Sequence, residues 1–140
     1  MLQTLHRRSE NAMGRIITSV TIENAADAEH ELRCDALVDT GASHMVLPKA
    51  WKERLGNLET LEVVEVETAD QKTTEGEICG PVRLQVEGFR TIFTEVLFIE
   101  MQPIDGHYEP LLGYIPLEQC QAAVDMLGHR LIRVRYLDLK

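Results

Sequence analysis

The chain has 140 residues, of which 44% are hydrophobic and 5% aromatic, and it carries a formal net charge of −9. This length and composition indicate one globular domain with a mainly aliphatic core. No cluster of lysine and arginine is longer than Arg7-Arg8, which argues against a nucleic-acid-binding surface, and no apolar run approaches membrane-spanning length. Since the first twenty residues also lack a signal-peptide core, we expect a cytoplasmic protein.

The residue types that commonly bind metals are scattered along the chain. The cysteines are odd in number and far apart, so we expect small buried side chains in a reducing compartment, not a disulfide frame or a zinc site; they are Cys34, Cys79 and Cys120. The histidines show no metal-ligand spacing; they are His6, His30, His44, His107 and His129. The sequence therefore predicts neither a metal site nor a cofactor.

Residues 1–14 are polar and are expected to form an arm ahead of a single domain at 15–140. Two interpretations of this arm stay open, a disordered terminus or a segment that orders across a dimer interface. From residue 15 the pattern becomes strand-like, with one strand expected at 16–22 and a second at 32–38.

The second predicted strand ends in an apolar run that stops at Asp39, Thr40 and Gly41. A carboxylate at the end of an apolar strand is poorly solvated, which is costly unless the protein uses its charge. The glycine frees the backbone to turn sharply, and the threonine hydroxyl can hold the turn by hydrogen bonding. A plain turn is the alternative, because all three residue types are common in turns. His44 either lines this site or is merely its neighbour in sequence.

The next segments predict a short helix and a hairpin. Pro48 is well placed to open a helix at 49–55, and Gly56 to stop it. Residues 61–67 and 73–78 are expected to pair around a polar tip that consists of Ala69, Asp70 and Gln71.

Glu65 and Glu67 share one face of the first hairpin strand, either as a solvated face or as a charge-selective wall for a substrate. Two further strands are expected at 82–86 and 91–99, on either side of a short turn at Glu87-Gly88.

A polar loop at 101–109 leads to the short apolar stretch Leu111-Leu112-Gly113. After it, the sequence predicts a helix from Pro116 that is capped just beyond its end by Gly128. Its apolar stripe consists of Leu117, Cys120, Val124 and Leu127. A last strand at 131–137 closes the chain.

Asp39-Thr40-Gly41-Ala42-Ser43 and Leu111-Leu112-Gly113 resemble, in this order, the two signatures of the retropepsin-like aspartic proteases. The resemblance implies a mostly β fold, a closed acid-protease barrel with one C-terminal helix before the last strand. It also implies that the Leu-Leu-Gly strand passes beside the aspartate loop. The hairpin at 61–78, with its tip at 69–71, would be the flap that closes over a substrate.

The resemblance implies an activity as well. Aspartic proteases hydrolyse peptide bonds with a water held between two carboxylates, and this chain has a single Asp-Thr-Gly. The resemblance therefore implies a homodimer that acts on a peptide or protein, with Asp39 from each copy as the catalytic residue. Thr40 would brace the two loops across the dyad, Gly41 would lie near the substrate, and Ala42 and Ser43 would complete the support of the site.

One departure separates the chain from the retroviral members of the family. Where they carry a paired Asp and Arg, this chain has Ser43 and Tyr114, so neither partner is left as an unpaired buried charge. This indicates a bacterial or otherwise cellular member in which another contact supports the interface. A non-catalytic peptide-binding or dimerisation module on the same fold is the alternative function.

Overall fold

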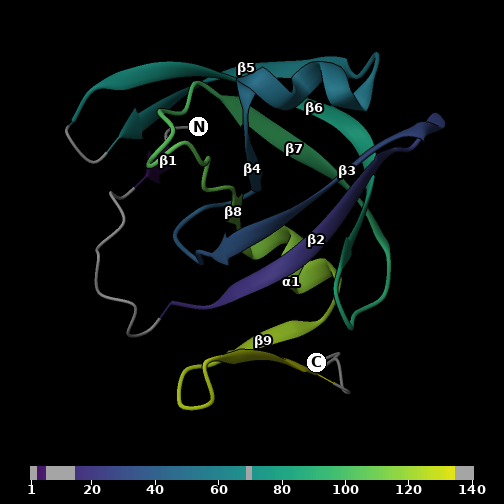
Figure 1. The fold of residues 1–140 in the computed structure, drawn as a ribbon, viewed down its shortest axis with the longest axis vertical. Helices are drawn as coiled ribbons and strands as arrows, with labels where there is room; N and C mark the ends of the chain where they lie inside the picture. Colours follow the sequence, from purple (N-terminus) through teal and green to yellow (C-terminus); the bar gives the residue numbers. More distant parts are fainter. Residues whose placement is uncertain (1–2, 6–14, 69–70, 135–140) are drawn as a thin grey trace, which may run out of the picture.

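A computed structural model of the protein describes residues 3–5, 15–68 and 71–134. Its elements follow one another as β1 (Gln3–Leu5), β2 (Ile17–Asn24), β3 (Asp27–Val38), β4 (Met45–Pro48), the 3-10 helix η1 (Lys49–Leu55), β5 (Glu59–Thr68), β6 (Thr73–Val86), β7 (Ile92–Ile99), β8 (Leu111–Leu112), α1 (Tyr114–Gln119), β9 (Ala122–Asp125) and β10 (Arg130–Arg133). The mostly β fold with one short helix before the final strands confirms the expected fold class (Figure 1).

The main sheet closes on itself. Its strands lie in the order β1-β5-β6-β2-β3-β8-β4-β7, and β7 also pairs with β6, so that the strands from β6 to β7 form a ring. Two connections in this ring join residues far apart in sequence: β8 pairs in parallel with β3 and antiparallel with β4. β9 and β10 form a separate two-stranded sheet beside the ring.

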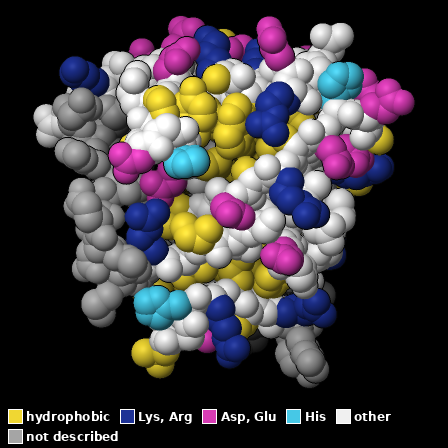
Figure 2. Space-filling view, viewed as in Figure 1, with side chains coloured by type: hydrophobic (Ala, Val, Ile, Leu, Met, Phe, Trp, Pro, Cys, Tyr) yellow, Lys and Arg dark blue, Asp and Glu magenta, His cyan; other side chains and the backbone are white. Residues whose placement is uncertain are grey.

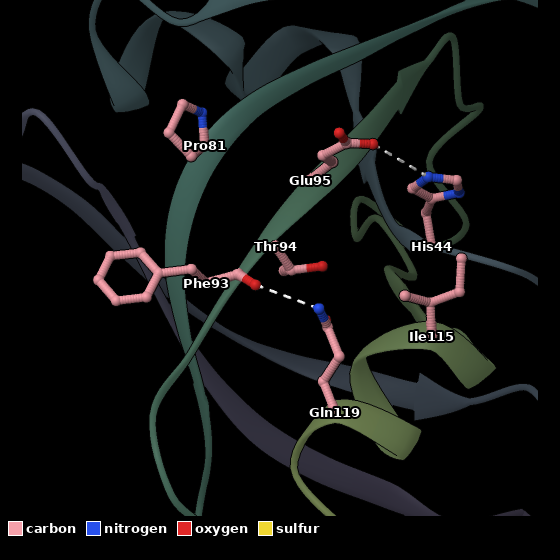
Figure 3. Close-up of a pocket in the computed structure, with 7 residues that line it drawn as sticks. All are labelled: His44, Pro81, Phe93, Thr94, Glu95, Ile115 and Gln119. Atoms are coloured by element: carbon pink, nitrogen blue, oxygen red, sulfur yellow. Dashed lines mark hydrogen bonds and ion pairs between the residues drawn. The ribbon is translucent and has the colours of Figure 1, made fainter.

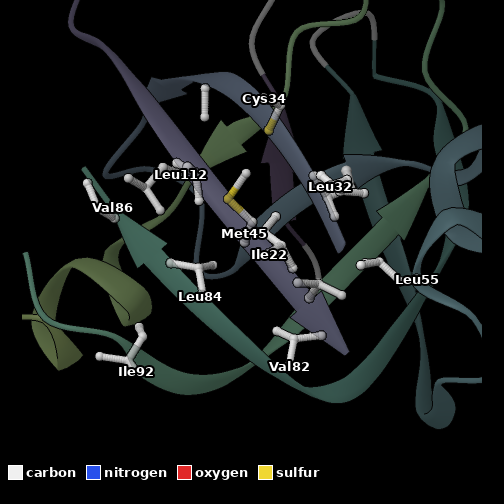
Figure 4. Packing of buried hydrophobic residues seen from close by; sticks show 14 of the residues in the cluster. Ile22, Leu32, Cys34, Met45, Leu55, Val82, Leu84, Val86, Ile92 and Leu112 are labelled. Carbon is white, nitrogen blue, oxygen red and sulfur yellow. The ribbon is translucent and has the colours of Figure 1, made fainter. Parts of the chain in front are cut away.

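Side chains that alternate along the strands fill the inside of the ring (Figure 4). Val20 and Ile22 of β2, Leu84 of β6 and Phe98 of β7 are fully buried there. A second cluster of buried apolar side chains lies on the other face of β4 and β7, under the β5–β6 hairpin; it consists of Leu37, Ala42, Val46, Val64, Val66, Ile78, Leu97, Ile99 and Leu111.

Most of the predicted strands are confirmed. The segments expected at 16–22 and 32–38 are β2 and β3, and the hairpin expected at 61–78 is formed by β5 and β6. The predicted helix at 49–55 is η1, which ends at Gly56 with φ at 70°. The strands expected at 73–78 and 82–86 are one continuous strand, β6, whose pairing with β7 shifts register between Cys79 and Val82.

The prediction of a helix over 116–127 was wrong in its second half. The helix α1 ends at Gln119, and Gln121 adopts a left-handed conformation with φ at 60°, which an α-helix does not continue through. Val124 then lies in β9, opposite Leu131 of β10, and Leu127 in the following turn is 97% exposed. The predicted last strand begins as β10; residues 135–137 lie outside the described part of the chain.

In the N-terminal arm, Gln3–Leu5 form β1 and pair in parallel with Val66–Thr68 of β5. Residues 1–2 and 6–14 lie outside the described part. All three cysteines are free and buried, which confirms the expectation that they are buried side chains. Burial raises the pKa of Cys34 to about 12.

On the face seen in Figure 2, acidic and basic side chains are interspersed among hydrophobic ones. None of the helices among the described residues is long and apolar enough to cross a membrane.

Candidate active site

The Asp39 loop, defined here as residues 39–44, follows the end of β3. Asp39 is half-buried, and its carboxylate accepts a hydrogen bond of 2.9 Å from the Gly41 N–H. The Ala42 N–H donates to the Asp39 carbonyl oxygen at 3.0 Å, and the Asp39 N–H donates to the Leu112 carbonyl oxygen at 3.0 Å. These bonds close a tight turn in which the direction of the carboxylate is set by backbone groups.

The two sequence signatures lie side by side, as the resemblance implied. β8 is inserted between the strands on either side of the Asp39 loop: Val38 of β3 and Met45 of β4 both lie opposite Leu112. Because β8 pairs with the strand that enters the loop and with the strand that leaves it, the two-residue strand fixes both ends of the loop.

Gly113 makes the closest approach to the Asp39 loop. A Cβ atom on this residue would lie 2.4 Å from the His44 carbonyl oxygen and 2.6 Å from that of Ala42, so every other residue type clashes with backbone. The Gly113 N–H donates to the His44 carbonyl oxygen at 3.0 Å, and the Tyr114 N–H donates to that of Ala42 at 2.9 Å. This close contact explains why a glycine follows Leu111-Leu112.

The loop residues differ in their exposure. Thr40 and Gly41 are exposed, whereas Ala42 is fully buried and Ser43 is 5% exposed. The Asp39 carboxylate and the Thr40 hydroxyl thus lie at the surface, whereas the following residues of the loop are packed into the domain. The expected role of Thr40 as a brace between two copies stays a prediction.

The β5–β6 hairpin covers the second cluster next to the loop. Val64 and Val66 point into this cluster, where Val46 and Leu111 also lie, whereas Glu65 is exposed. Of the predicted tip, Ala69 and Asp70 lie outside the described residues, and Gln71 is exposed with φ at 64°. The assignment of this hairpin as a flap stays a prediction.

Ser43 pairs with His44, and His44 in turn faces Glu95, a residue that the sequence did not single out. Ser43 Oγ lies 2.7 Å from His44 Nδ1, and His44 Nε2 lies 3.7 Å from the Glu95 carboxylate on β7. Burial lowers the pKa of His44, partly offset by the negative charge of Glu95. Tyr114, at the position where retroviral members carry Arg, is 43% exposed.

A cavity of about 380 Å³ opens beside His44 (Figure 3). Its wall is made by residues from β6, β7 and α1 together with His44; the others are Pro81, Phe93, Thr94, Glu95, Ile115 and Gln119. The Gln119 amide donates to the Phe93 carbonyl oxygen at 3.2 Å and so fastens α1 to β7. Within residues 3–5, 15–68 and 71–134, no group of three or more His, Cys, Asp or Glu side chains is arranged to hold a metal ion.

Comparison with known proteins agrees with this geometry. A family model described as aspartyl protease matches residues 18–114, which include both signatures. Among solved structures, the fold is similar to that of the EIAV protease in complex with the inhibitor HBY-793, with a TM-score of 0.55 and 24% sequence identity over 79% of this chain and 92% of that chain. No curated protein matches the sequence.

Proposed function

The chain belongs to the aspartyl protease family, and we propose that it is an endopeptidase whose active site forms when two copies bring their Asp39 carboxylates together. Its family and its retropepsin-like fold make it a hydrolase of the aspartic peptidase type. The proposal adds the catalytic residue, the homodimer and the mechanism.

The need for a second copy follows from the chemistry. Peptide hydrolysis by carboxylates requires an ionised group that takes a proton from water and a protonated group that donates to the scissile carbonyl oxygen. Two carboxylates roughly 3 Å apart share one proton and titrate as a pair, as is established for aspartic proteases as a class. Each chain has one Asp-Thr-Gly, so one copy supplies half of this pair.

In the proposed reaction, the ionised Asp39 removes a proton from the water while the water oxygen bonds to the carbonyl carbon. The protonated Asp39 of the second copy donates its proton to the carbonyl oxygen, which gives a neutral tetrahedral intermediate. The C–N bond then breaks as the amine nitrogen takes a proton from one carboxyl group and the hydroxyl of the intermediate returns a proton to the other. The pair again holds one proton at the end.

The observation that carries the proposal is the position of Asp39. Its carboxylate is half-buried and held by the Gly41 N–H at the end of β3, while Thr40 beside it is exposed. Close backbone contacts with Gly113 hold the buried part of the loop. A second copy that bound at the exposed Thr40 would therefore meet a loop whose backbone geometry is already fixed.

We propose a peptide or protein as the substrate, held in an extended conformation between the Asp39 loop and the β5–β6 hairpin. Extended peptides bind well against strands because main-chain groups pair along the strand edge.

The test is the variant Asp39→Asn, which keeps the size of the side chain and removes its acid–base chemistry. We expect cleavage of an unfolded protein substrate at mildly acid pH to fall by more than about 10³-fold, with the dimer and its thermal unfolding unchanged. Asp35→Asn is the matched control, because Asp35 is an exposed carboxylate on β3, the strand that leads into Asp39.

Two results would contradict the proposal. One is full activity of Asp39→Asn. The other is a protein that stays monomeric at high concentration in analytical ultracentrifugation and binds an unfolded peptide without cleaving it, which would favour a non-catalytic binding module. Inhibition of cleavage by pepstatin is expected, since pepstatin imitates the tetrahedral intermediate.

A further inference from the structure

The side chains of Ser43 and His44 form a buried connection between the Asp39 loop and strand β7. Ser43 Oγ lies 2.7 Å from His44 Nδ1. On the other side of the ring, His44 Nε2 lies 3.7 Å from Oε1 of Glu95, whose side chain is 50% exposed (Figure 3). Ser43 and His44 are 5% and 8% exposed. Buried polar side chains of this kind cost free energy unless they are paired, so the arrangement fixes the geometry around it.

The chemistry of the three groups sets the direction of the hydrogen bond between Ser43 and His44. A carboxylate only accepts, so the ring nitrogen that faces Glu95 carries the proton. In a neutral imidazole the other nitrogen, Nδ1, is then an acceptor, and Ser43 donates its hydroxyl proton to it. Ser43 therefore donates to His44, whose Nε2–H faces the Glu95 carboxylate at 3.7 Å, an ion-pair distance.

The same two residues are also held through their backbone. The Ser43 carbonyl oxygen accepts the Ile115 N–H at 2.9 Å, and the His44 carbonyl oxygen accepts the Gly113 N–H at 3.0 Å. Main-chain bonds thus tie the C-terminal end of the Asp39 loop to α1 and β8, and the side chains tie it to β7.

We infer that His44 is a positioning residue: through Ser43 and Glu95 it holds the C-terminal half of the Asp39 loop in the geometry that Asp39 needs. The effect of His44 on catalysis rests on the proposed function. Its effect on the conformation of the loop rests on the distances above.

A nucleophilic role for Ser43 is a different interpretation of a serine, a histidine and a carboxylate in one row. The burial of Ser43 argues against it, because a substrate carbon cannot approach a side chain that is 5% exposed. The neighbouring cavity of about 380 Å³ is lined by His44 and not by Ser43. The connection therefore acts on the loop and not directly on a substrate.

The connection depends on pH. Protonation of His44 places a hydrogen on Nδ1, which then repels the Ser43 hydroxyl proton and forces that hydroxyl to turn. Burial lowers the pKa of His44, and negative charge from Glu95 on β7 and from Glu62 on β5 raises it. The residues that α1 and β6 place on the adjoining cavity are uncharged: Ile115, Gln119 and Pro81.

The experiment compares His44→Ala with His44→Asn. Asparagine places an amide oxygen close to the position of Nδ1, so it accepts from Ser43 at every pH, whereas alanine removes this acceptor. We expect kcat of His44→Ala to fall about ten- to hundredfold with little change in KM, since a small displacement of a catalytic group has this effect. His44→Asn should keep most of kcat and extend activity to lower pH.

A matched control is His30→Asn. His30 is an exposed histidine on β3 that pairs with Asp27, and its loss should leave the pH profile as it is. An unchanged kcat and pH profile in His44→Ala would overturn the inference. So would equal losses in the alanine and asparagine variants.

A second measurement separates this inference from the proposed protease activity. Backbone amide hydrogen exchange at Gly41 and Ala42 reports on the Asp39 loop whether or not the protein cleaves peptides. We expect exchange there to be at least tenfold faster in His44→Ala and near the wild-type rate in His44→Asn. Unchanged exchange in His44→Ala overturns the positioning role, whereas failure of the proposed function shows itself in Asp39→Asn alone.

Discussion

One tightly placed glycine, Gly113, lies against the Asp39 loop, and another, Gly128, lies in the turn of the C-terminal β9–β10 hairpin; the two differ in what surrounds them. Gly113 lies against the backbone of Ala42 and His44, which belong to a segment far away in the sequence. A Cβ atom on Gly128 would also lie 2.4 Å from a neighbouring atom, but that atom is Oδ2 of Asp125 in the same hairpin.

The conformation of the Asp39 loop thus depends on contacts with residues distant in sequence, whereas that of the hairpin turn depends on neighbours within the hairpin. The Asp39 loop has buried residues at its base and strands on both sides. The hairpin pairs with no other strand among the described residues, and its turn exposes Met126 and Leu127. A two-stranded hairpin has little stability of its own, so small changes there have small effects on the domain.

The largest difference in stability is expected between alanine substitutions at the two glycines. Gly113→Ala places a methyl group against backbone that cannot move without displacing the Asp39 loop, so we expect a loss of about 3 kcal/mol or more in the free energy of unfolding, together with loss of activity. Gly128→Ala pushes only on the side chains of Asp125 and Arg130, which can move, and should cost less than about 1 kcal/mol. Urea unfolding of both variants measures the difference. Equal losses would break the comparison.

A pair of leucines gives the next largest difference. Leu112 is fully buried beside the Asp39 loop, so Leu112→Ala should lower the free energy of unfolding by about 2–5 kcal/mol through the cavity it leaves. Leu127 is 97% exposed, and Leu127→Ala should change it by less than about 0.5 kcal/mol. Thermal unfolding distinguishes the two. A large loss in Leu127→Ala would mean that the hairpin turn is covered in solution.

The stability that His44 contributes next to the Asp39 loop is expected to depend on pH. The low pKa of His44 means that the unfolded chain binds a proton more readily than the folded one. The associated stability is fully present above pH 6.5, the ordinary value, and is lost as the pH falls through the lower pKa of the folded protein. We expect the free energy of unfolding of the wild type to decline on acidification in this range more steeply than that of His44→Asn. Parallel curves for the two proteins would contradict the assignment.

The smallest effect belongs to the hairpin. The Gly128 N–H and, after it, Arg130 lower the pKa of Asp125 below its ordinary value of 3.8, so the contribution of Asp125 is present above pH 3.8 and is lost as the pH falls through the lower value. Arg130→Gln should raise this pKa only part of the way, because the larger cause remains. A titration followed by NMR measures it; a full return to 3.8 would assign the shift to Arg130 instead.

Much of the fold could be predicted from local patterns. Alternation of apolar and polar residues located β2, β3, β5 and β7, and Pro48 and Gly56 marked the two ends of η1. The spacing of Leu117, Cys120, Val124 and Leu127 was misleading, since it fits a helix equally well. Only Leu117 and Cys120 are buried in the core, and the chain leaves the helix before it reaches the other two.

The parts of the site that depend on residue type could be predicted. The parts that depend on how the strands pair could not. Asp39 and Gly113 stand out because an acid at the end of an apolar strand and a glycine after two leucines are unusual. Glu95 could not be found, because nothing near it in sequence marks it. It faces His44 only because β4 and β7 pair with Met45 opposite Val96.

The sequence by itself determined the two signatures, the strand-forming alternation and the single Asp-Thr-Gly on which the proposal of a second copy rests. These depend on residue types and short spacings, which are local properties of the chain. Only the tertiary structure decided that β8 lies between β3 and β4, that the chain beyond Gln119 turns into a hairpin, and that His44 faces Glu95. Each of these depends on which distant segments meet, and the free energy that selects those meetings comes from burial in a shared core and not from any one segment.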